Sequence, residues 1–148
     1  MTVELSRTSR LIAGILLLSL VTVETGGLYL VSLVGYSGEA TDFQLGFSRA
    51  GHAHAGVLLI LSLVALLYAD AARLSGVLGW LARLGIPVAA LLMPAGFFFS
   101  SLGSGAQRPN GFIVLLYLGA ISLAVGLITL GVGVLRSALR ARHGVTYH

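Results

Sequence analysis

Two histidines lie close together in a chain whose apolar stretches carry few ionisable side chains. His52 and His54 follow Arg49-Ala50-Gly51 at the start of the second apolar stretch. Neutral imidazole is a ligand for zinc, copper, nickel and haem iron. Residues two apart on a regular α-helix point about 200° apart. Both histidines can therefore bind one ion only if residue 52 precedes the first helical turn. Otherwise one imidazole is the ligand, or both are hydrogen-bonded interfacial residues.

Glu24 is the one carboxyl group near the middle of an apolar stretch, and Thr22 and Thr25 flank it. An ionisable residue at that depth in lipid is costly and is a functional candidate by default. It can transfer a proton or pair with a substituent of a cofactor. Alternatively, a protonated carboxyl group hydrogen-bonds to Thr22 or to a neighbouring helix and has no chemical role.

Four more side chains reach the level of the histidines if successive apolar stretches cross a membrane in alternating directions. One outer layer then collects Tyr29, Phe98, Asn110 and Tyr117 next to Arg49. The catalytic or substrate-orienting candidates are Glu24, Tyr29, Phe98, Asn110 and Tyr117. Arg49 joins His52 and His54 as a cofactor-binding candidate. The plain alternatives are packing for Phe98 and a helix-capping role for Asn110.

The composition excludes several classes of protein. The chain has 148 residues, of which 57 % are hydrophobic and 9 % are charged, whereas a soluble domain has about 25 % charged residues. No cysteine is present, so disulfides and thiolate chemistry are excluded. The sequence contains no phosphate loop, dinucleotide fingerprint, zinc-protease helix or nucleophile elbow. A disordered chain, a nucleic-acid-binding module and a disulfide scaffold are excluded, and an integral membrane protein is predicted.

Four apolar stretches are long enough to cross about 30 Å of hydrocarbon as helices. The predicted spans are residues 11–34, 51–69, 84–102 and 111–135, within a single membrane domain over residues 1–148. The segments between them, 35–50, 70–83 and 103–110, are predicted loops, with Trp80 at headgroup level. The predicted fold class is an all-α, four-helix transmembrane bundle.

The arginines predict the orientation of this bundle. Two lie at the N-terminus, two in the predicted loop 70–83 and three in the C-terminal tail, which leaves Arg49 and Arg108 on the other side. The positive-inside rule then places both termini in the cytoplasm and the chain in a bacterial-type inner membrane. We interpret the tail arginines as an anchor on anionic membrane lipids.

Small residues within the spans predict close contacts between helices. The glycines concerned are Gly27, Gly56, Gly96, Gly119 and Gly126. Pro87 and Pro94 are expected to bend the third helix and to free backbone carbonyls. Because so small a chain rarely builds an active site or pore alone, we expect a homo-oligomer.

Several short segments follow one another in an order that resembles a known family. They include Gly27-Leu28-Tyr29, Arg49-Ala50-Gly51-His52, Gly96-Phe97-Phe98 and Pro109-Asn110. With the four-span layout, they resemble the styrene oxide isomerases, which are small bacterial membrane enzymes that bind haem b. The position of the histidine also resembles, more loosely, subunit I of the haem-copper oxidases.

The resemblance implies a trimer that binds haem b near the subunit boundary, with His52 as the axial ligand of the iron and His54 as its rival. It also implies that ferric haem acts as a Lewis acid on an epoxide, which opens to an aldehyde by hydride migration. The substrate would be a small apolar molecule from the lipid phase. The sequence departs from the family by the extra Gly51, by the second histidine, and by Phe98 where the family has a tyrosine.

Three other functions stay open at this stage. A haem or metal protein for electron transfer or sensing would use both histidines as ligands. A small transport module for protons or metal ions would line its pathway with Glu24 and the histidines. An accessory subunit would bind no cofactor, and mutation of its histidines would have no effect.

Overall fold

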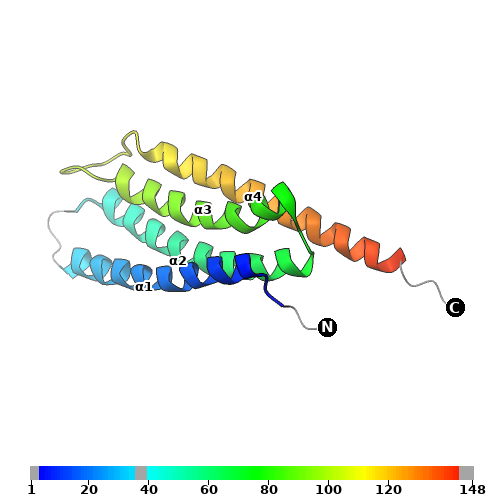
Figure 1. The fold of residues 1–148 in the computed structure, drawn as a ribbon. Coiled ribbons are helices and arrows are strands. Elements are labelled where there is room, and N and C mark those ends of the chain that lie inside the picture. The colour runs from blue at the N-terminus through cyan, green and yellow to red at the C-terminus, as the bar shows by residue number, and fades with distance from the viewer. Residues whose placement is uncertain (1–3, 36–39, 144–148) are drawn as a thin grey trace.

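The computed structural model describes residues 4–35 and 40–143, and these residues form four long helices (Figure 1). The helices are α1 (Arg7–Gly35), α2 (Asp42–Ala71), α3 (Gly76–Ser100) and α4 (Ile113–His143). All four are long and apolar enough to cross a membrane, and the described part of the chain contains no strand. The predicted all-helical fold with four helices of membrane-spanning length is confirmed.

Helix α2 begins earlier than predicted, so the predicted loop 35–50 is wrong for residues 42–50. Thr41 caps the helix: its hydroxyl accepts a hydrogen bond from the Gln44 amide at 3.2 Å, and the Gln44 side chain accepts one from the Thr41 amide at 3.1 Å. This capping box is a start signal that hydropathy alone does not detect. Residues 36–39 of the predicted loop lie outside the described residues.

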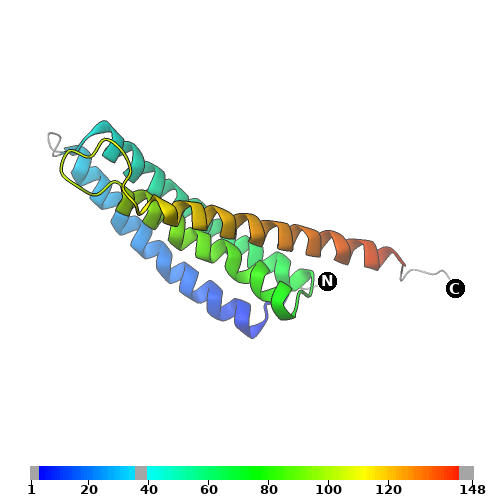
Figure 2. The same ribbon diagram turned by 90° about the horizontal axis from the view of Figure 1, so that it is seen from above.

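Two further boundaries differ from the prediction. Helix α3 begins at Gly76, so the predicted loop 70–83 is only a four-residue connection, 72–75, and Trp80 is helical. Helix α4 extends to His143, beyond the predicted residue 135, and its last turns pass the ends of the other helices (Figures 1 and 2). Polar residues at a helix end lower the local hydropathy without ending the helix.

Helices α3 and α4 make the most extensive contact, through small residues. A Cβ atom on Gly85 would lie 2.6 Å from Cα of Gly126, and one on Gly96 would lie 2.5 Å from the Leu116 amide nitrogen. One on Gly119 would meet Met93 Cγ at 2.5 Å. The predicted close contacts at Gly96, Gly119 and Gly126 are confirmed, and Gly85 is a further one. Without Cβ atoms the two backbones can touch.

The buried core is small, and most large apolar side chains lie on the outside. Leu66 and Ile86 are the largest apolar side chains that are fully buried, and alanines fill much of the remaining interior. Helix α1 is the most exposed of the four helices. Only 6 % of the residues in its most apolar stretch are buried, and it packs mainly against α2. This distribution is the reverse of that in a soluble bundle.

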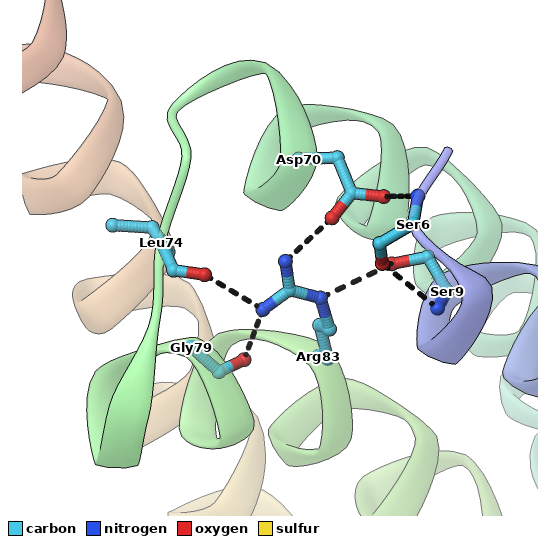
Figure 3. Close-up of polar contacts among 6 residues, drawn as sticks. All are labelled: Ser6, Ser9, Asp70, Leu74, Gly79 and Arg83. Carbon is cyan, nitrogen blue, oxygen red and sulfur yellow. Dashed lines mark hydrogen bonds and ion pairs between the residues drawn. The ribbon is translucent and has the colours of Figure 1, made fainter. Parts of the chain in front are cut away.

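A buried ion pair joins segments that are distant in sequence (Figure 3). The Arg83 guanidinium donates to Asp70 Oδ1 at 2.5 Å, and these side chains are 11 % and 5 % exposed. The other carboxylate oxygen of Asp70 accepts a hydrogen bond from the Ser6 amide at 2.8 Å. Arg83 also donates through Nε to the Ser9 hydroxyl at 3.1 Å. The pair thus connects α2 and α3 to the start of α1.

Arg83 also fixes the connection between α2 and α3. Its Nη1 atom donates to the carbonyl oxygens of Leu74 and Gly79, at 3.0 Å each. Burial of a guanidinium group is tolerated when its donors are satisfied. The four bonds from Arg83 to Asp70, Ser9, Leu74 and Gly79, together with the bond from the Ser6 amide to Asp70, hold one end of the bundle in a single arrangement.

The contact between α3 and α4 can be tested with a matched pair of substitutions. Gly85→Ala places a methyl group against Gly126 and should destabilise the fold by about 1–3 kcal/mol, as overpacking does. Gly131→Ala adds the same group to α4 where nothing lies within 4 Å, so stability should be unchanged or slightly higher. Unfolding by sodium dodecyl sulfate, followed by circular dichroism, measures both. Equal stability of the two variants would contradict the close contact.

The ion pair makes a second prediction. Arg83→Met leaves the buried Asp70 carboxylate without its partner and should cost about 3–5 kcal/mol of unfolding free energy. Arg10→Met removes an exposed arginine at the same end and should cost less than about 0.5 kcal/mol. The same unfolding assay applies, and a double-mutant cycle with Asp70→Asn isolates the coupling between the two side chains. Additive losses in that cycle would argue against the pair.

Candidate functional site

Both histidines lie well inside α2, about three turns after its start at Asp42. The condition under which they could bind one ion together, that residue 52 precedes the helix, is therefore not met. Their positions at the first turns of a span, as predicted, are also wrong, because the helix begins nine residues earlier. On the regular helix the two imidazoles leave opposite sides, and each must be considered alone.

The ring of His54 is oriented by its own helix. Its Nδ1 atom lies 2.7 Å from the carbonyl oxygen of Ala50. Since a carbonyl can only accept, Nδ1 carries the proton and Nε2 of the neutral ring keeps its lone pair. The ring also packs on Phe97, with centroids 4.9 Å apart, and Phe97 meets the edge of Phe47 at 5.4 Å. His54 is half-buried, with one nitrogen free to bind an electrophile.

The ring of His52 points to the other side, against α1. A Cβ atom on Gly27 would lie 3.3 Å from Cε1 and 3.5 Å from Nε2 of this ring, and one on Gly26 would lie 3.5 Å from Nδ1. The two glycines therefore leave just enough room for the imidazole. No hydrogen bond orients the ring within the described part of the chain. The nitrogen edge of His52 faces a helix backbone, which leaves little space for a large planar cofactor.

His52 lies at one end of a cleft between α1, α2 and α3. The cleft has a volume of about 470 Å³, which is in the range of small-molecule sites. Its walls are mainly apolar, and the side chains that line it include Ser19, Thr22, His52, Pro87, Pro94 and Phe98. The hydroxyls of Ser19 and Thr22 donate to backbone carbonyls of their own helix. His52 is thus the only titratable side chain among the lining residues.

Of the other predicted site residues, Phe98 is the one that lines the cleft. A Cβ atom on Gly51 would lie 3.0 Å from the ring of Phe98. The Phe98 ring therefore also packs directly against the backbone of α2. Tyr29 is 53 % exposed on α1 and Tyr117 is 61 % exposed on α4. The structure does not bring these two tyrosines to the cleft.

Asn110 stabilises the connection between α3 and α4. Its side chain donates to the Phe99 carbonyl at 3.0 Å and accepts from the Phe112 amide at 2.9 Å. Both polar ends of the amide are therefore engaged by the backbone. The Asn110 side chain therefore stabilises the turn that precedes α4, whose first helical residue is Ile113.

Glu24 and Arg49 are both exposed on the surface of the chain. The Thr22 hydroxyl donates to Ser19, and the Thr25 hydroxyl donates to Val21. Both hydroxyls therefore donate within their own helix, and no hydrogen bond joins Glu24 to Thr22 in the described part of the chain. Arg49 lies five residues before His54 on the same helix, and no described carboxylate pairs with it.

The cleft shows what the sequence analysis missed. Ser19, Ala90 and Ala95 line it together with the two prolines of α3, and none of these residues belongs to a recognisable sequence motif.

A cluster of three or more His, Cys, Asp or Glu side chains that could hold a metal ion does not occur in residues 4–35 and 40–143. No protein-family model, no curated protein and no solved structure matches the chain.

Proposed function

We propose that the chain is a multi-pass protein of a bacterial-type inner membrane, with both termini in the cytoplasm, that binds haem b through one axial histidine and isomerises a small apolar epoxide to an aldehyde. The four apolar helices and the arginine distribution support the membrane topology. The resemblance to the styrene oxide isomerases supports the cofactor and the reaction. The iron ligand proposed here is His54, whereas the resemblance implied His52.

The contact of His54 with Ala50 carries the assignment of the iron ligand. Metal-bound histidines almost always donate their second ring nitrogen to a carbonyl or carboxylate, which fixes the tautomer and the direction of the lone pair. His54 has this arrangement, with Nδ1 2.7 Å from the Ala50 carbonyl oxygen. The ring of His52 lacks such a partner and faces α1. The His54 ring is half-buried and packs on Phe97, and on the strength of its oriented nitrogen we assign the ligand to His54.

The remaining roles follow from position. Arg49 offers a cationic side chain near the haem ligand for a carboxylate substituent. Ferric haem, when bound, supplies a Lewis acid for an epoxide oxygen. The apolar cleft beside His52 has the size and lining to accept a small apolar molecule from the lipid phase. His52 and the cleft lie on the opposite side of α2 from His54, so the cleft serves as the entry and storage site for this substrate.

We further propose that a second copy of the chain covers α1, in a homo-oligomer for which the resemblance implies a trimer. Glu24 is exposed on this helix, and a carboxyl group in hydrocarbon costs about 2.5–3.5 kcal/mol when charged. Leu17, Val21, Leu28 and Val31 share its face at alternating spacings of three and four, and each is more than half exposed. That spacing is the one by which helices pack in pairs.

Substitution of each histidine tests the haem assignment. The protein purified in mild detergent after expression with added haem should show a Soret band with one haem per chain. His54→Ala should lose the band, because the oriented ligand is gone, and His52→Ala should keep it. Absorption spectra of the oxidised and dithionite-reduced protein provide the measurement. Loss of haem from His52→Ala alone would reverse the assignment, and a colourless wild-type protein would reject haem binding.

The reaction requires a separate assay. The haem-loaded protein should convert an aryl epoxide to its aldehyde without an added reductant, and the rate should fall at least tenfold in His54→Ala. A five-coordinate ferric spectrum is expected, because one ligand leaves a coordination position for the substrate. A six-coordinate, readily reduced haem without isomerase activity would favour electron transfer, with each histidine supplied by a different copy of the chain.

Single cysteines test the oligomer, because the chain contains none of its own. Leu28→Cys, on the face of α1 that carries Glu24, should form a disulfide-linked pair in membranes under mild oxidation. Ile121→Cys, which is similarly exposed on α4, should stay monomeric on a non-reducing gel. Equal cross-linking of the two variants would indicate random collision rather than an α1 interface.

A further inference from the structure

A second cavity lies beside the connection between α2 and α3. At this end of the bundle α4 passes the ends of the other helices (Figures 1 and 2). It is a groove of about 340 Å³ between the connection 72–75 and one face of α4. The residues that determine its chemistry are Arg73, Ser75, Leu78, Val132, Arg136 and Arg140. This groove is separate from the histidine cleft and shares no residue with it.

Three guanidinium groups surround the groove. Arg73, Arg136 and Arg140 are all exposed, and the last two lie one turn apart on α4. No acidic residue lines the groove, and within the described residues the one ion pair is that of Arg83 with Asp70. Like charges held together repel one another, so an anion that enters among them is strongly favoured. Arginine is the side chain best suited to bind phosphate oxygens in pairs.

The backbone that presents Arg73 and Ser75 is held in place before any ligand arrives. The Leu74 carbonyl accepts a hydrogen bond from Arg83 (Figure 3). The Leu74 side chain sits on Gly133, where an added Cβ would meet it at 2.7 Å. Arg73 itself adopts a left-handed conformation with φ of 52°. Ser75 occupies the N-cap position of α3, but its hydroxyl makes no capping bond, so it is available as a further donor.

The wall of the groove toward the middle of the bundle is apolar. Leu78, Ile128 and Val132 line it and are 52 %, 66 % and 40 % exposed. The groove therefore combines a cationic rim at the helix ends with an apolar floor that continues along α3 and α4. An inorganic anion would use only the rim, whereas a lipid with an anionic head group would use both parts.

We infer that this groove is a binding site for one anionic phospholipid, whose phosphate lies among Arg73, Arg136 and Arg140 and whose acyl chain follows Leu78 and Val132. This proposal gives two of the tail arginines, Arg136 and Arg140, a defined lipid-binding site. A general electrostatic attraction of the tail to the membrane surface would involve no such site. The inference does not depend on haem or on the proposed reaction.

Native mass spectrometry of the full chain in a mild non-ionic detergent tests the site. Dioctanoyl phosphatidylglycerol, dioctanoyl phosphatidylcholine and inorganic phosphate are titrated separately. One phosphatidylglycerol per chain should bind saturably, and phosphatidylcholine should bind at least tenfold more weakly. Arg136→Gln should weaken the anionic lipid about fivefold, the usual effect of one basic residue at a lipid surface. The triple variant Arg73→Asn, Arg136→Gln, Arg140→Gln should lose at least tenfold, with asparagine chosen to tolerate the left-handed backbone.

A matched control removes the same charge elsewhere. Arg7→Gln, Arg10→Gln and Arg108→Gln together neutralise three exposed arginines that do not line the groove, and this variant should bind phosphatidylglycerol within twofold of the wild type. An equal loss in the control and the groove variant would overturn the site in favour of general attraction to charge. Displacement of the lipid by inorganic phosphate at equal concentration would overturn it in favour of a soluble phosphate compound. Circular dichroism checks that each variant is folded. If the triple variant does not fold, the binding of phosphatidylglycerol to the single Arg136→Gln variant tests the site.

Discussion

The buried guanidinium group of Arg83 is the interaction on which the arrangement of this bundle depends. It is paired with Asp70 and hydrogen-bonded to the Leu74 and Gly79 carbonyls and to the Ser9 hydroxyl. A buried cation must satisfy its donors, so all these groups must meet in one geometry. The start of α1, the end of α2 and the connection to α3 are fixed together. Helix α1 otherwise packs mainly against α2, and the bond of Ser9 with Arg83 also joins it to α3.

The small residues between α3 and α4 explain where a ligand can bind. Gly85 and Gly126 bring the two backbones into contact, which leaves no volume between these helices. Large apolar side chains consequently lie on the outer surface of the bundle. The prolines of α3 face the opposite direction, toward α1, and line the cleft with alanines and Ser19. Helix α3 thus packs closely against α4 through its glycines and leaves open space beside its prolines, on the side of α1.

Helix α2 separates two chemical environments. On one side His52 fits against the glycines of α1 at the end of an apolar cleft. On the other side the hydrogen bond to Ala50 orients the ring of His54, which packs on Phe97. In the proposed function the oriented ring binds haem and the cleft holds the apolar substrate. The arginine groove at the far end of the molecule adds a lipid contact that is separate from both. Each of the three regions has its own chemistry, although one short chain supplies them all.

Features that depend on neighbours along the chain could be predicted from the amino-acid sequence. Four stretches of sufficient apolar length predicted four helices, because backbone groups placed in lipid would need partners within their own segment, and the structure contains these four helices. Gly96, Gly119 and Gly126 indicated close helix contacts, and the spacing of His52 and His54 indicated opposite directions once both were helical. The capping box at Thr41 was also present in the sequence, but the hydropathy of residues 42–50 concealed it.

Which of these side chains meet depends on how the helices pack, and this could not be predicted from the sequence. Asp70 and Ser6 are 64 residues apart in sequence, and no local pattern pairs them with Arg83. Tyr29 and Tyr117 share a predicted depth with the histidines, yet depth does not fix rotation about the helix axis, and both face outward. The choice between His52 and His54 likewise depends on what packs against each ring, namely α1 for one and Phe97 for the other. Helix formation is a local property, whereas the rotation and pairing of helices follow from the packing of the whole bundle.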